Sequence, residues 1–292
     1  MTRGIGVDWG SSNARAWVFG DGGEILAEST AQIDFSEAKQ KGFERCFEEL
    51  VRPLAAFQYL PVVACGMVGA RGGWQEVPYV RTPRALNDVV AQPFSGPNQE
   101  MYILPGVSTS SPAPDVMRGE ETQICGAALL GHSGWFCLPG THSKWANVED
   151  QKITEFKTFV TGELFSLSQQ HAIYGALSED GVPDWDSFKI GVQTAIDTPL
   201  LSALFQTRSR VLCEDLTPQQ STWFMSGCLI GSEVFAAKPA GGSVTLIADG
   251  RLRELYATAL TSLKCEFTLV SAERCTTHAL FFALKILEKV AA

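Results

Sequence analysis

The sequence predicts an α/β protein made of two lobes, and two observations lead to this prediction. The chain has 292 residues, which is longer than a single hydrophobic core usually supports. A pattern of three short strands also occurs twice, once around Gly10 and once around Gly140, and helical segments follow each copy. This spacing indicates a duplicated lobe rather than a short repeat, although two unrelated hairpins could also resemble each other.

The composition is that of an ordinary soluble globular protein, with 45% hydrophobic and 19% charged residues. The net charge of −9 argues against general binding of nucleic acid, so any anionic ligand has to be held by a few local basic groups. The sequence has neither a signal peptide nor an apolar run of membrane-spanning length. The eight cysteines contain no CxxC pair, which is typical of reduced thiols. We therefore expect a cytoplasmic protein that does not bind membranes.

The first three-strand pattern runs over residues 4–30, as "GIGVDWG", "ARAWVFG" and "EILAES". An acid within an apolar strand costs free energy unless it is paired, solvated or bound to a metal, so Asp8 is a site candidate. The turn that follows, Gly10, Ser11, Ser12 and Asn13, is either an ordinary hairpin turn or a group of N–H and hydroxyl donors that binds phosphate.

The rest of the first half is predicted as a helical segment over 36–57, a strand over 60–66 and a glycine-rich segment over 66–80. A strand over 101–107 and the connector "STSSPAPDV" come next. We place the boundary between the lobes in this connector. The predicted division is an N-terminal lobe of residues 1–114 and a C-terminal lobe of residues 115–292.

The second half begins with a helix in "RGEETQICGAALLG", whose first turn carries Glu120 and Glu121. The second three-strand pattern, "WFCLPGTHSKWANVEDQKITEF", has its turn at Gly140, Thr141, His142 and Ser143. Thr217, Pro218 and Gln220 predict a capped helix start. A strand then ends in Asp249 and Gly250, and a helix, a short strand and an amphipathic terminal helix complete the chain.

These pieces favour phosphoryl transfer. Two turns with donors could hold a polyphosphate, and Asp8 could bind Mg²⁺ or its waters, because Mg²⁺ uses only one or two carboxylates. A kinase also needs a carboxylate that accepts the proton of the acceptor hydroxyl, and Glu120 and Glu121 are the candidates. Acids are also common in a first helical turn for dipole reasons alone. Walker, dinucleotide-binding and nucleophile-elbow motifs are not found, and the four histidines have no metal-ligand spacing.

Five segments in this order, "DWGSSNARAW", "CGMVGARGGW", "VMRGEETQ", "LPGTHSKW" and "TGEL", resemble the sugar-kinase, Hsp70 and actin superfamily and, within it, the 2-dehydro-3-deoxygalactonokinase family. The resemblance covers essentially the whole chain. It implies two ribonuclease-H-like lobes, the actin-like ATPase fold, with a central nucleotide cleft. It also implies an ATP- and Mg²⁺-dependent transferase of carbohydrate metabolism that phosphorylates the 6-hydroxyl of 2-dehydro-3-deoxy-D-galactonate in galactonate catabolism.

The resemblance also assigns residues. It implies that Asp8 and residues 10–13 form the first phosphate loop and residues 140–143 the second. It places the catalytic acid on Glu120, with Glu121 as the alternative because relatives usually have Asp there. The adenine segment falls on Asp249 and Gly250, where the superfamily usually has two glycines.

The sugar acid would be read by the segment "GMVGARGGW", which contains Met67, Arg71 and Trp74. Arginine offers the bidentate geometry that carboxylates prefer, so Arg71 and Arg118, together with Lys144, are candidates for its carboxylate. Each could instead be a solvated surface charge, and Trp74 a core aromatic residue; for Arg71 the two interpretations are about equally supported. The alternatives are a kinase for another sugar or keto-deoxy sugar acid, a phosphohydrolase of this fold and a non-kinase ATPase of the actin or Hsp70 kind. The epimer preference and the oligomeric state are not predicted.

Overall fold

The first three predicted strands form an antiparallel meander in the computed structural model, which describes residues 2–57, 59–91, 93–97, 100–179, 181–239 and 242–291. They are β1 (Thr2–Trp9), β2 (Ala14–Gly20) and β3 (Ile25–Ala31). The sheet order is β3-β2-β1-β4-β8-β7, and the added strands are β4 (Val62–Gly66), β8 (Met101–Ile103) and β7 (Phe94–Ser95). Because β4 runs parallel to β1 and β8 parallel to β4, their carboxyl ends lie at one edge of the sheet.

A second six-stranded sheet repeats this arrangement and supports the predicted duplication. Its order is β15-β14-β11-β12-β13-β6, so a meander again continues into a strand that is parallel to its first member, β14 beside β11. The strands are β11 (Gly134–Leu138), β12 (Ser143–Glu149), β13 (Lys152–Phe159), β14 (Val244–Ile247), β15 (Phe267–Val270) and β6 (Arg84–Ala85). A three-stranded sheet contains β5 (Tyr79–Arg81), β9 (Gly106–Thr109) and β10 (Asp115–Met117).

The helices of the first half differ from the prediction in one respect. The predicted helical segment over 36–57 is broken, because Gly42 has a φ of 92° that a continuous helix does not allow. It consists of α1 (Phe35–Lys41), α2 (Phe43–Val51) and the 3₁₀ helix Arg52–Phe57. A short 3₁₀ turn, Met67–Gly69, and α3 (Leu86–Ala91) follow, and the predicted acid-led helix is α4 (Glu120–Leu129).

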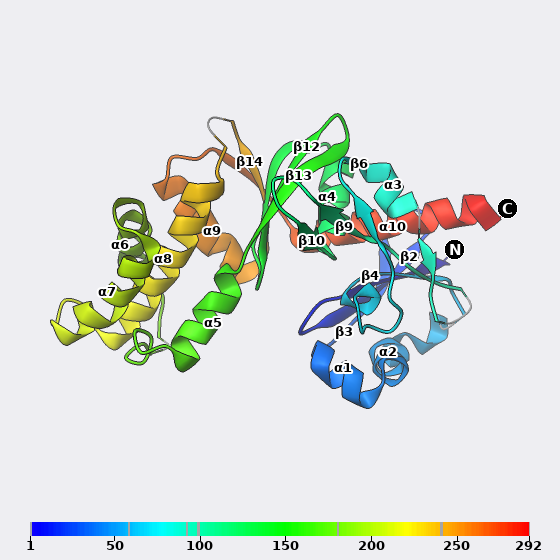
Figure 1. Cartoon of the computed structure of the whole chain (residues 1–292). Coiled ribbons are helices and arrows are strands. Elements are labelled where there is room, and N and C mark those ends of the chain that lie inside the picture. The colour runs from blue at the N-terminus through cyan, green and yellow to red at the C-terminus, as the bar shows by residue number, and fades with distance from the viewer. Residues whose placement is uncertain are drawn as a thin grey trace. The chain divides into compact units, whose positions relative to one another are not determined.

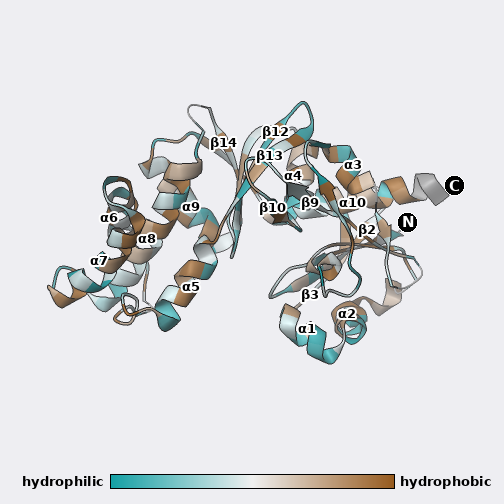
Figure 2. Cartoon of the chain, in the orientation of Figure 1, coloured by the Kyte–Doolittle hydropathy of each residue, from teal (hydrophilic) through white to brown (hydrophobic). Residues whose placement is uncertain are grey.

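The helices of the second half include a predicted capped helix that is confirmed. Helix α8 (Pro218–Ala237) begins with a reciprocal capping box between Thr217 and Gln220. Helices α6, α7 and α8 pack side by side (Figure 1), and the hydropathy colouring of α8 is mostly apolar (Figure 2), as its burial requires. The other helices are α5 (Thr161–His171), α6 (Trp185–Asp197), α7 (Leu200–Leu212), α9 (Gly250–Ser262) and α10 (Ala272–Ala291).

The contacts divide the chain into two compact units. Unit 1 contains residues 1–133, 146–156 and 270–292, and unit 2 contains residues 134–145 and 157–269. Helix α4 therefore groups with unit 1, where it crosses α10 so closely that a Cβ on Gly126 would lie 1.8 Å from the Cys275 carbonyl oxygen. The division at residue 114 into two lobes stays a prediction.

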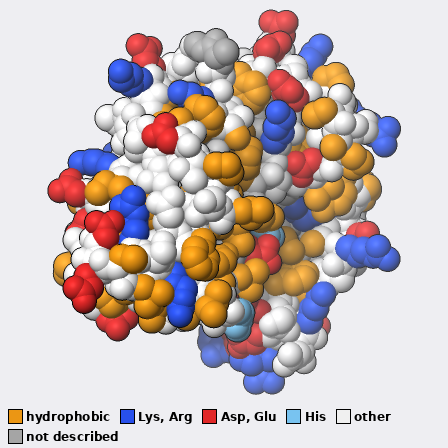
Figure 3. All heavy atoms as spheres, turned by 60° about the vertical axis from the view of Figure 1, so that its left-hand side comes forward, with side chains coloured by type: hydrophobic (Ala, Val, Ile, Leu, Met, Phe, Trp, Pro, Cys, Tyr) orange, Lys and Arg blue, Asp and Glu red, His pale blue; other side chains and the backbone are white. Residues whose placement is uncertain are grey.

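The surface carries charges of both signs. On the face shown in Figure 3, acidic and basic side chains are interspersed with apolar ones. Among the described residues, no helix is both long enough and apolar enough to cross a bilayer.

Candidate active site

Asp8 lies near the carboxyl end of β1, between two partners that the strand register fixes. It pairs with Arg15 on β2 and with Cys65 on β4. The side chain is half-buried, and the Cys65 thiol donates to its Oδ1 atom over 3.6 Å. Burial raises the pKa of Asp8 and the charge of Glu120 adds to the rise, while the thiol and Arg15 act in the opposite direction. A cation beside this carboxylate would favour its charged form.

The first predicted phosphate loop is a four-residue turn, because Trp9 pairs with Ala14. The turn is closed by a hydrogen bond from the Gly10 N–H to the Asn13 carbonyl oxygen at 2.8 Å. Ser11, Ser12 and Asn13 are exposed. The Phe35 N–H donates to the Ser11 carbonyl oxygen at 2.9 Å, which ties the turn to the start of α1. Polar groups of the loop are therefore presented to solvent on a fixed backbone.

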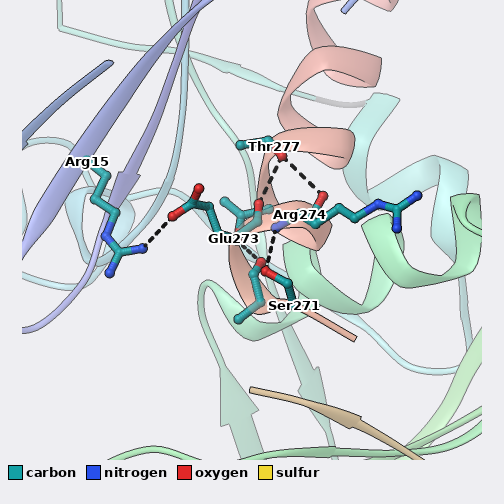
Figure 4. A network of polar contacts seen from close by, with 7 residues as sticks. Arg15, Ser271, Glu273, Arg274 and Thr277 are labelled. Atoms are coloured by element: carbon teal, nitrogen blue, oxygen red, sulfur yellow. Dashed lines mark hydrogen bonds and ion pairs between the residues drawn. The ribbon is translucent and has the colours of Figure 1, made fainter. Parts of the chain in front are cut away.

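Arg15 belongs to this region, although it was not among the predicted site residues. Its Nη1 atom lies 3.3 Å from Oε2 of Glu273, in the first turn of α10. Figure 4 shows this ion pair beside the hydrogen bonds of that turn, where the Arg274 N–H donates to Ser271 and Thr277 donates to the carbonyl oxygen of Glu273. The signal in the sequence was the hairpin register, since a four-residue turn places residue 15 opposite residue 8.

The first turn of α4 separates the two predicted acids. Glu121 is fully buried, and both of its carboxyl oxygens accept from the Gly119 N–H at 2.8 Å. Burial, with the charge of Glu120 second, raises the pKa of Glu121 to about 8. Glu120 is only half-buried, and its Oε2 atom accepts from the Arg118 N–H at 3.1 Å. Of the two acids, Glu120 alone reaches the surface.

The carboxyl ends of β1 and β4 lie beside the start of α4. A Cβ on Gly119 would lie 3.5 Å from the Cα atom of Gly66, and a Cβ on Gly66 would lie 3.5 Å from Oδ1 of Asp8. Both glycines have positive φ, 111° and 88°, so larger residues would be strained there. The carboxyl ends of parallel strands are where α/β proteins bind ligands. Asp8 and Glu120 therefore share one such edge.

The predicted substrate residues have different surroundings. Arg71 is exposed, and its neighbour Gly72 lies close to the ammonium group of Lys39, which a Cβ there would approach to 3.0 Å. Met67, in the 3₁₀ turn after β4, is half-buried. Trp74 is also half-buried and packs on Phe47 with ring centroids 5.5 Å apart.

The other two predicted cations each donate to a backbone carbonyl oxygen, but the buried Nε and Nη1 atoms of Arg118 have no partner among the described residues. Arg118 donates through Nη2 to the Val77 carbonyl oxygen at 2.7 Å and stacks over Tyr79 at 4.3 Å. Lys144, in unit 2, is buried, and its ammonium group donates to the His142 carbonyl oxygen at 3.0 Å. Each side chain thus binds a backbone carbonyl oxygen within or next to a predicted binding segment.

The second predicted phosphate loop lies against the start of α5. The Glu163 N–H donates to the Thr141 carbonyl oxygen at 3.0 Å, and the Glu163 side chain pairs with His142 Nε2 at 2.7 Å. A Cβ on Gly162 would lie 2.5 Å from the Gly140 carbonyl oxygen, so glycine permits this approach. Thr141 and His142 are exposed. The backbone of the loop is thus fixed against α5, while the side chains of Thr141 and His142 are exposed to solvent.

Ser143, the last residue assigned to this loop, is instead the buried first residue of β12. Its Oγ atom lies 2.8 Å from the hydroxyl of Tyr256, which donates to Oε2 of Glu233 at 2.7 Å. Glu233 also accepts from Trp145 Nε1 at 2.9 Å and from the Thr161 hydroxyl. Glu233 was not among the predicted site residues, although it is a single acid within a long apolar helix.

A cavity of about 260 Å³ lies beside this network in unit 2. It is mostly apolar, and Gly140 of the loop forms part of its wall. Asp249 and Gly250 are exposed after β14 and directly precede the α9 residues of the lining. The lining residues are Gly140, Thr161, Gly162, Phe165, Thr222, Ser226, Leu229, Ile230, Arg251, Leu252, Leu255 and Tyr256.

Known proteins resemble the chain over almost its whole length. The family model of 2-keto-3-deoxy-galactonokinase matches residues 8–283. A protein of Rhizobium meliloti, provisionally named 2-dehydro-3-deoxygalactonokinase, is 36% identical over 284 residues, which cover 91% of this chain and 92% of the relative. The 2-dehydro-3-deoxygalactonokinase of Escherichia coli is 32% identical over 276 residues, with coverage of 93% and 94%.

Solved structures confirm the predicted fold class. A crystal structure from Sinorhizobium meliloti, provisionally described as a 2-dehydro-3-deoxygalactonokinase, has a TM-score of 0.91 at 34% identity and covers 97% of this chain and 96% of its own. The activator of the 2-hydroxyisocaproyl-CoA dehydratase from Clostridium difficile has a TM-score of 0.54 at 12% identity, with coverage of 100% and 97%. The second likeness concerns the fold alone. The actin-like ATPase fold, with its ribonuclease-H-like sheets, is thus confirmed.

We expect the buried Glu121 carboxyl to make stability depend on pH. Its pKa of about 8 lies above the ordinary value of 4.5, so between these values the folded chain binds one more proton than the unfolded chain. The free energy of unfolding should therefore fall as pH rises from about 5 to about 8, by up to about 1.4 kcal/mol per pH unit from this group. Urea unfolding at several pH values should show this slope in the wild type and a shallower one in Glu121→Gln.

Glu48→Gln is the matched control, because Glu48 is an exposed glutamate on α2 of the same unit. Its unfolding curves should keep the wild-type slope. Parallel slopes for Glu121→Gln and the wild type would contradict the prediction.

Proposed function

This chain belongs to the 2-keto-3-deoxy-galactonokinase family, and we propose that it transfers the γ-phosphoryl group of ATP to the 6-hydroxyl of 2-dehydro-3-deoxy-D-galactonate. The product is 2-dehydro-3-deoxy-6-phospho-D-galactonate. The observation that carries the proposal is the family match over residues 8–283, which includes both predicted loops and both acids. Its chemistry requires a site for ATP, a base for the hydroxyl and a site for the acid group of the sugar.

The turn at residues 10–13 of unit 1 and the turn at residues 140–142 of unit 2 are each proposed to bind phosphate oxygens of ATP. Their exposed residues, Ser11 to Asn13 in one and Thr141 and His142 in the other, offer the N–H and hydroxyl donors that phosphate oxygens require. The adenosine would enter the apolar cavity beside Gly140, since nucleosides favour largely apolar pockets with a few polar groups. Asp249 and Gly250 would then lie at the edge of the adenosine site rather than in its wall.

Glu120 is the proposed general base. A base has to be ionised at the working pH and must reach the hydroxyl proton. Glu121 fails on both counts, because it is fully buried and its pKa of about 8 keeps it mostly protonated near neutrality. Glu120 is half-buried at the edge where Asp8 also lies, and its position is fixed by the Arg118 N–H.

Asp8 is the proposed ligand of Mg²⁺. No group of three or more His, Cys, Asp or Glu side chains in the described part of the chain could hold a metal by itself. A single half-buried carboxylate does fit Mg²⁺, which keeps several of its waters and binds through one or two carboxylates and the phosphates of its substrate. The ion would neutralise charge on the phosphate groups.

Arg71 is the proposed partner of the sugar-acid carboxylate. Arg71 is exposed in the glycine-rich segment that follows β4, whereas Arg118 and Lys144 each donate to a backbone carbonyl oxygen. Arg118 stays the second candidate, because its buried Nε and Nη1 atoms have no hydrogen-bond partner within the residues that the structure describes. The ammonium group of Lys39 lies next to Gly72, the neighbour of Arg71, and would add positive charge close to the proposed carboxylate site. An exposed guanidinium can offer both of its N–H edges to a carboxylate.

The function is tested by measuring ADP release with a panel of acceptors. The panel contains the galacto and gluco epimers of the 2-keto-3-deoxy sugar acid, a neutral hexose and water alone. We expect rapid ADP release with the galacto acid and formation of its 6-phosphate. Release without any acceptor would identify a phosphohydrolase, and release with the hexose alone would identify a different sugar kinase.

Glu120→Gln should lower kcat by roughly 10²- to 10⁴-fold, the usual range for removal of a general base, with little change in KM for ATP. The amide keeps the shape of the side chain but cannot accept the hydroxyl proton. Steady-state kinetics of the variant and of Glu121→Gln, at saturating sugar acid, measure the effect. Wild-type turnover in Glu120→Gln together with a loss in Glu121→Gln would move the base to Glu121.

Arg71→Gln should raise KM for the sugar acid by about 10- to 100-fold, because a hydrogen bond to a charged group is lost. KM for ATP should stay within twofold of the wild type. Arg45→Gln, which replaces another exposed arginine of unit 1, is the control. Equal KM values for Arg71→Gln and this control would show that the carboxylate binds elsewhere.

A further inference from the structure

We propose that Glu233 is a positioning residue for ATP. Through its hydrogen bonds, it holds the loop at residues 140–142 and the adjoining wall of the cavity in the geometry that binds the nucleotide. This inference rests on the proposed function, because it takes that loop and that cavity as the ATP site. Glu233 itself is 2% exposed, so a nucleotide in the cavity would not contact it directly. Its effect would pass through the side chains that donate to it.

The Glu233 carboxylate accepts hydrogen bonds from three different elements. Oε1 accepts from the indole N–H of Trp145 on β12 at 2.9 Å. Oε2 accepts from the hydroxyl of Tyr256 on α9 at 2.7 Å and from the hydroxyl of Thr161 at the start of α5. Ser143 joins through Tyr256 at 2.8 Å. One side chain of α8 thus fixes β12, α5 and α9 relative to one another within unit 2.

These three elements border the loop or the cavity. Ser143 begins the strand directly after the loop, and α5 carries the Glu163 N–H that binds the Thr141 carbonyl oxygen. Thr161 and Tyr256 both line the cavity. A shift of any of these donors would therefore move the loop backbone or the cavity wall.

Burying a carboxylate at this position costs free energy that an apolar side chain filling the same space would not. Burial raises the pKa of Glu233, which shows the penalty that its charged form bears. Replacement of buried polar groups by well-packed apolar residues is often neutral or stabilising. What an apolar side chain cannot do is fix hydroxyl and indole donors in direction. Directional positioning is thus the property that this glutamate adds to an otherwise apolar helix.

The test compares Glu233→Gln and Glu233→Ala with the wild-type full chain. Measurements are KM for ATP, KM for the sugar acid, kcat and the thermal midpoint. We expect KM for ATP to rise by about tenfold in Glu233→Gln and further in Glu233→Ala, because buried donors lose their acceptor. KM for the sugar acid should stay within twofold. If Glu233→Ala does not fold, Thr161→Val removes one donor without changing its volume and should also raise KM for ATP.

Two controls separate positioning from stability and from the proposed function. Ser221→Ala removes a buried hydroxyl of the same helix that bonds Ser178 and the Pro218 carbonyl oxygen, and it should lower the thermal midpoint while leaving KM for ATP unchanged. Gly140→Val places a side chain on the loop, where its Cβ would meet only the His142 nitrogen at 4.0 Å, and should block phosphate binding.

Unchanged KM for ATP in Glu233→Gln, when Gly140→Val loses ATP affinity, would overturn the role of Glu233 and leave the ATP site standing. Unchanged KM for ATP in both would overturn the assignment of the loop and, with it, this inference. A lower thermal midpoint in Glu233→Gln with wild-type KM values would show a purely structural residue and would also overturn the proposal.

Discussion

The parallel pairing of β1 with β4 is the constraint on which the chemistry of unit 1 depends. Because both strands run the same way, Asp8 and Cys65 end up side by side in the register, and Gly66 follows at the same edge. The start of α4 reaches this edge only because Gly66 and Gly119 lack side chains where their backbones approach each other. An antiparallel β4 would carry Gly66 to the opposite end of the sheet. The acids of β1 and α4 would then share no surface.

Once three acids are brought this close, their environments have to differ. Asp8 has the cation of Arg15 opposite it, and Arg15 is in turn paired with Glu273. Glu121 is buried and holds the Gly119 backbone through both oxygens. Glu120 keeps partial contact with solvent. Burial raises the pKa of Glu121 to about 8, so this acid is mostly protonated near neutrality and serves to hold the backbone at the start of α4.

The sequence allowed much of this to be predicted, since local patterns carry the information. The alternation around Gly10 and Gly140 predicted both meanders, and Thr217, Pro218 and Gln220 predicted the start of α8. The break at Gly42 was missed because glycine is tolerated within helical patterns, and its positive φ follows from tertiary packing. The exposure that separates Glu120 from Glu121 was also missed, because two adjacent acids look alike until the helix is placed against the sheet.

The unpredicted polar contacts follow the duplication itself. Aligned without gaps at Gly10 and Gly140, Asp8 corresponds to Leu138 and Arg15 corresponds to Trp145. The acid next to the turn is therefore present in only one copy. The residue five positions after the glycine nevertheless donates to a glutamate in both copies: Arg15 to Glu273 of α10, and Trp145 to Glu233 of α8. The exposed pair uses a charged donor, while the buried pair uses a neutral indole, which avoids a second buried charge. Each turn is thus fixed to a helix far away in the sequence, and only the copy with Asp8 has a carboxylate at the strand end to offer to a cation.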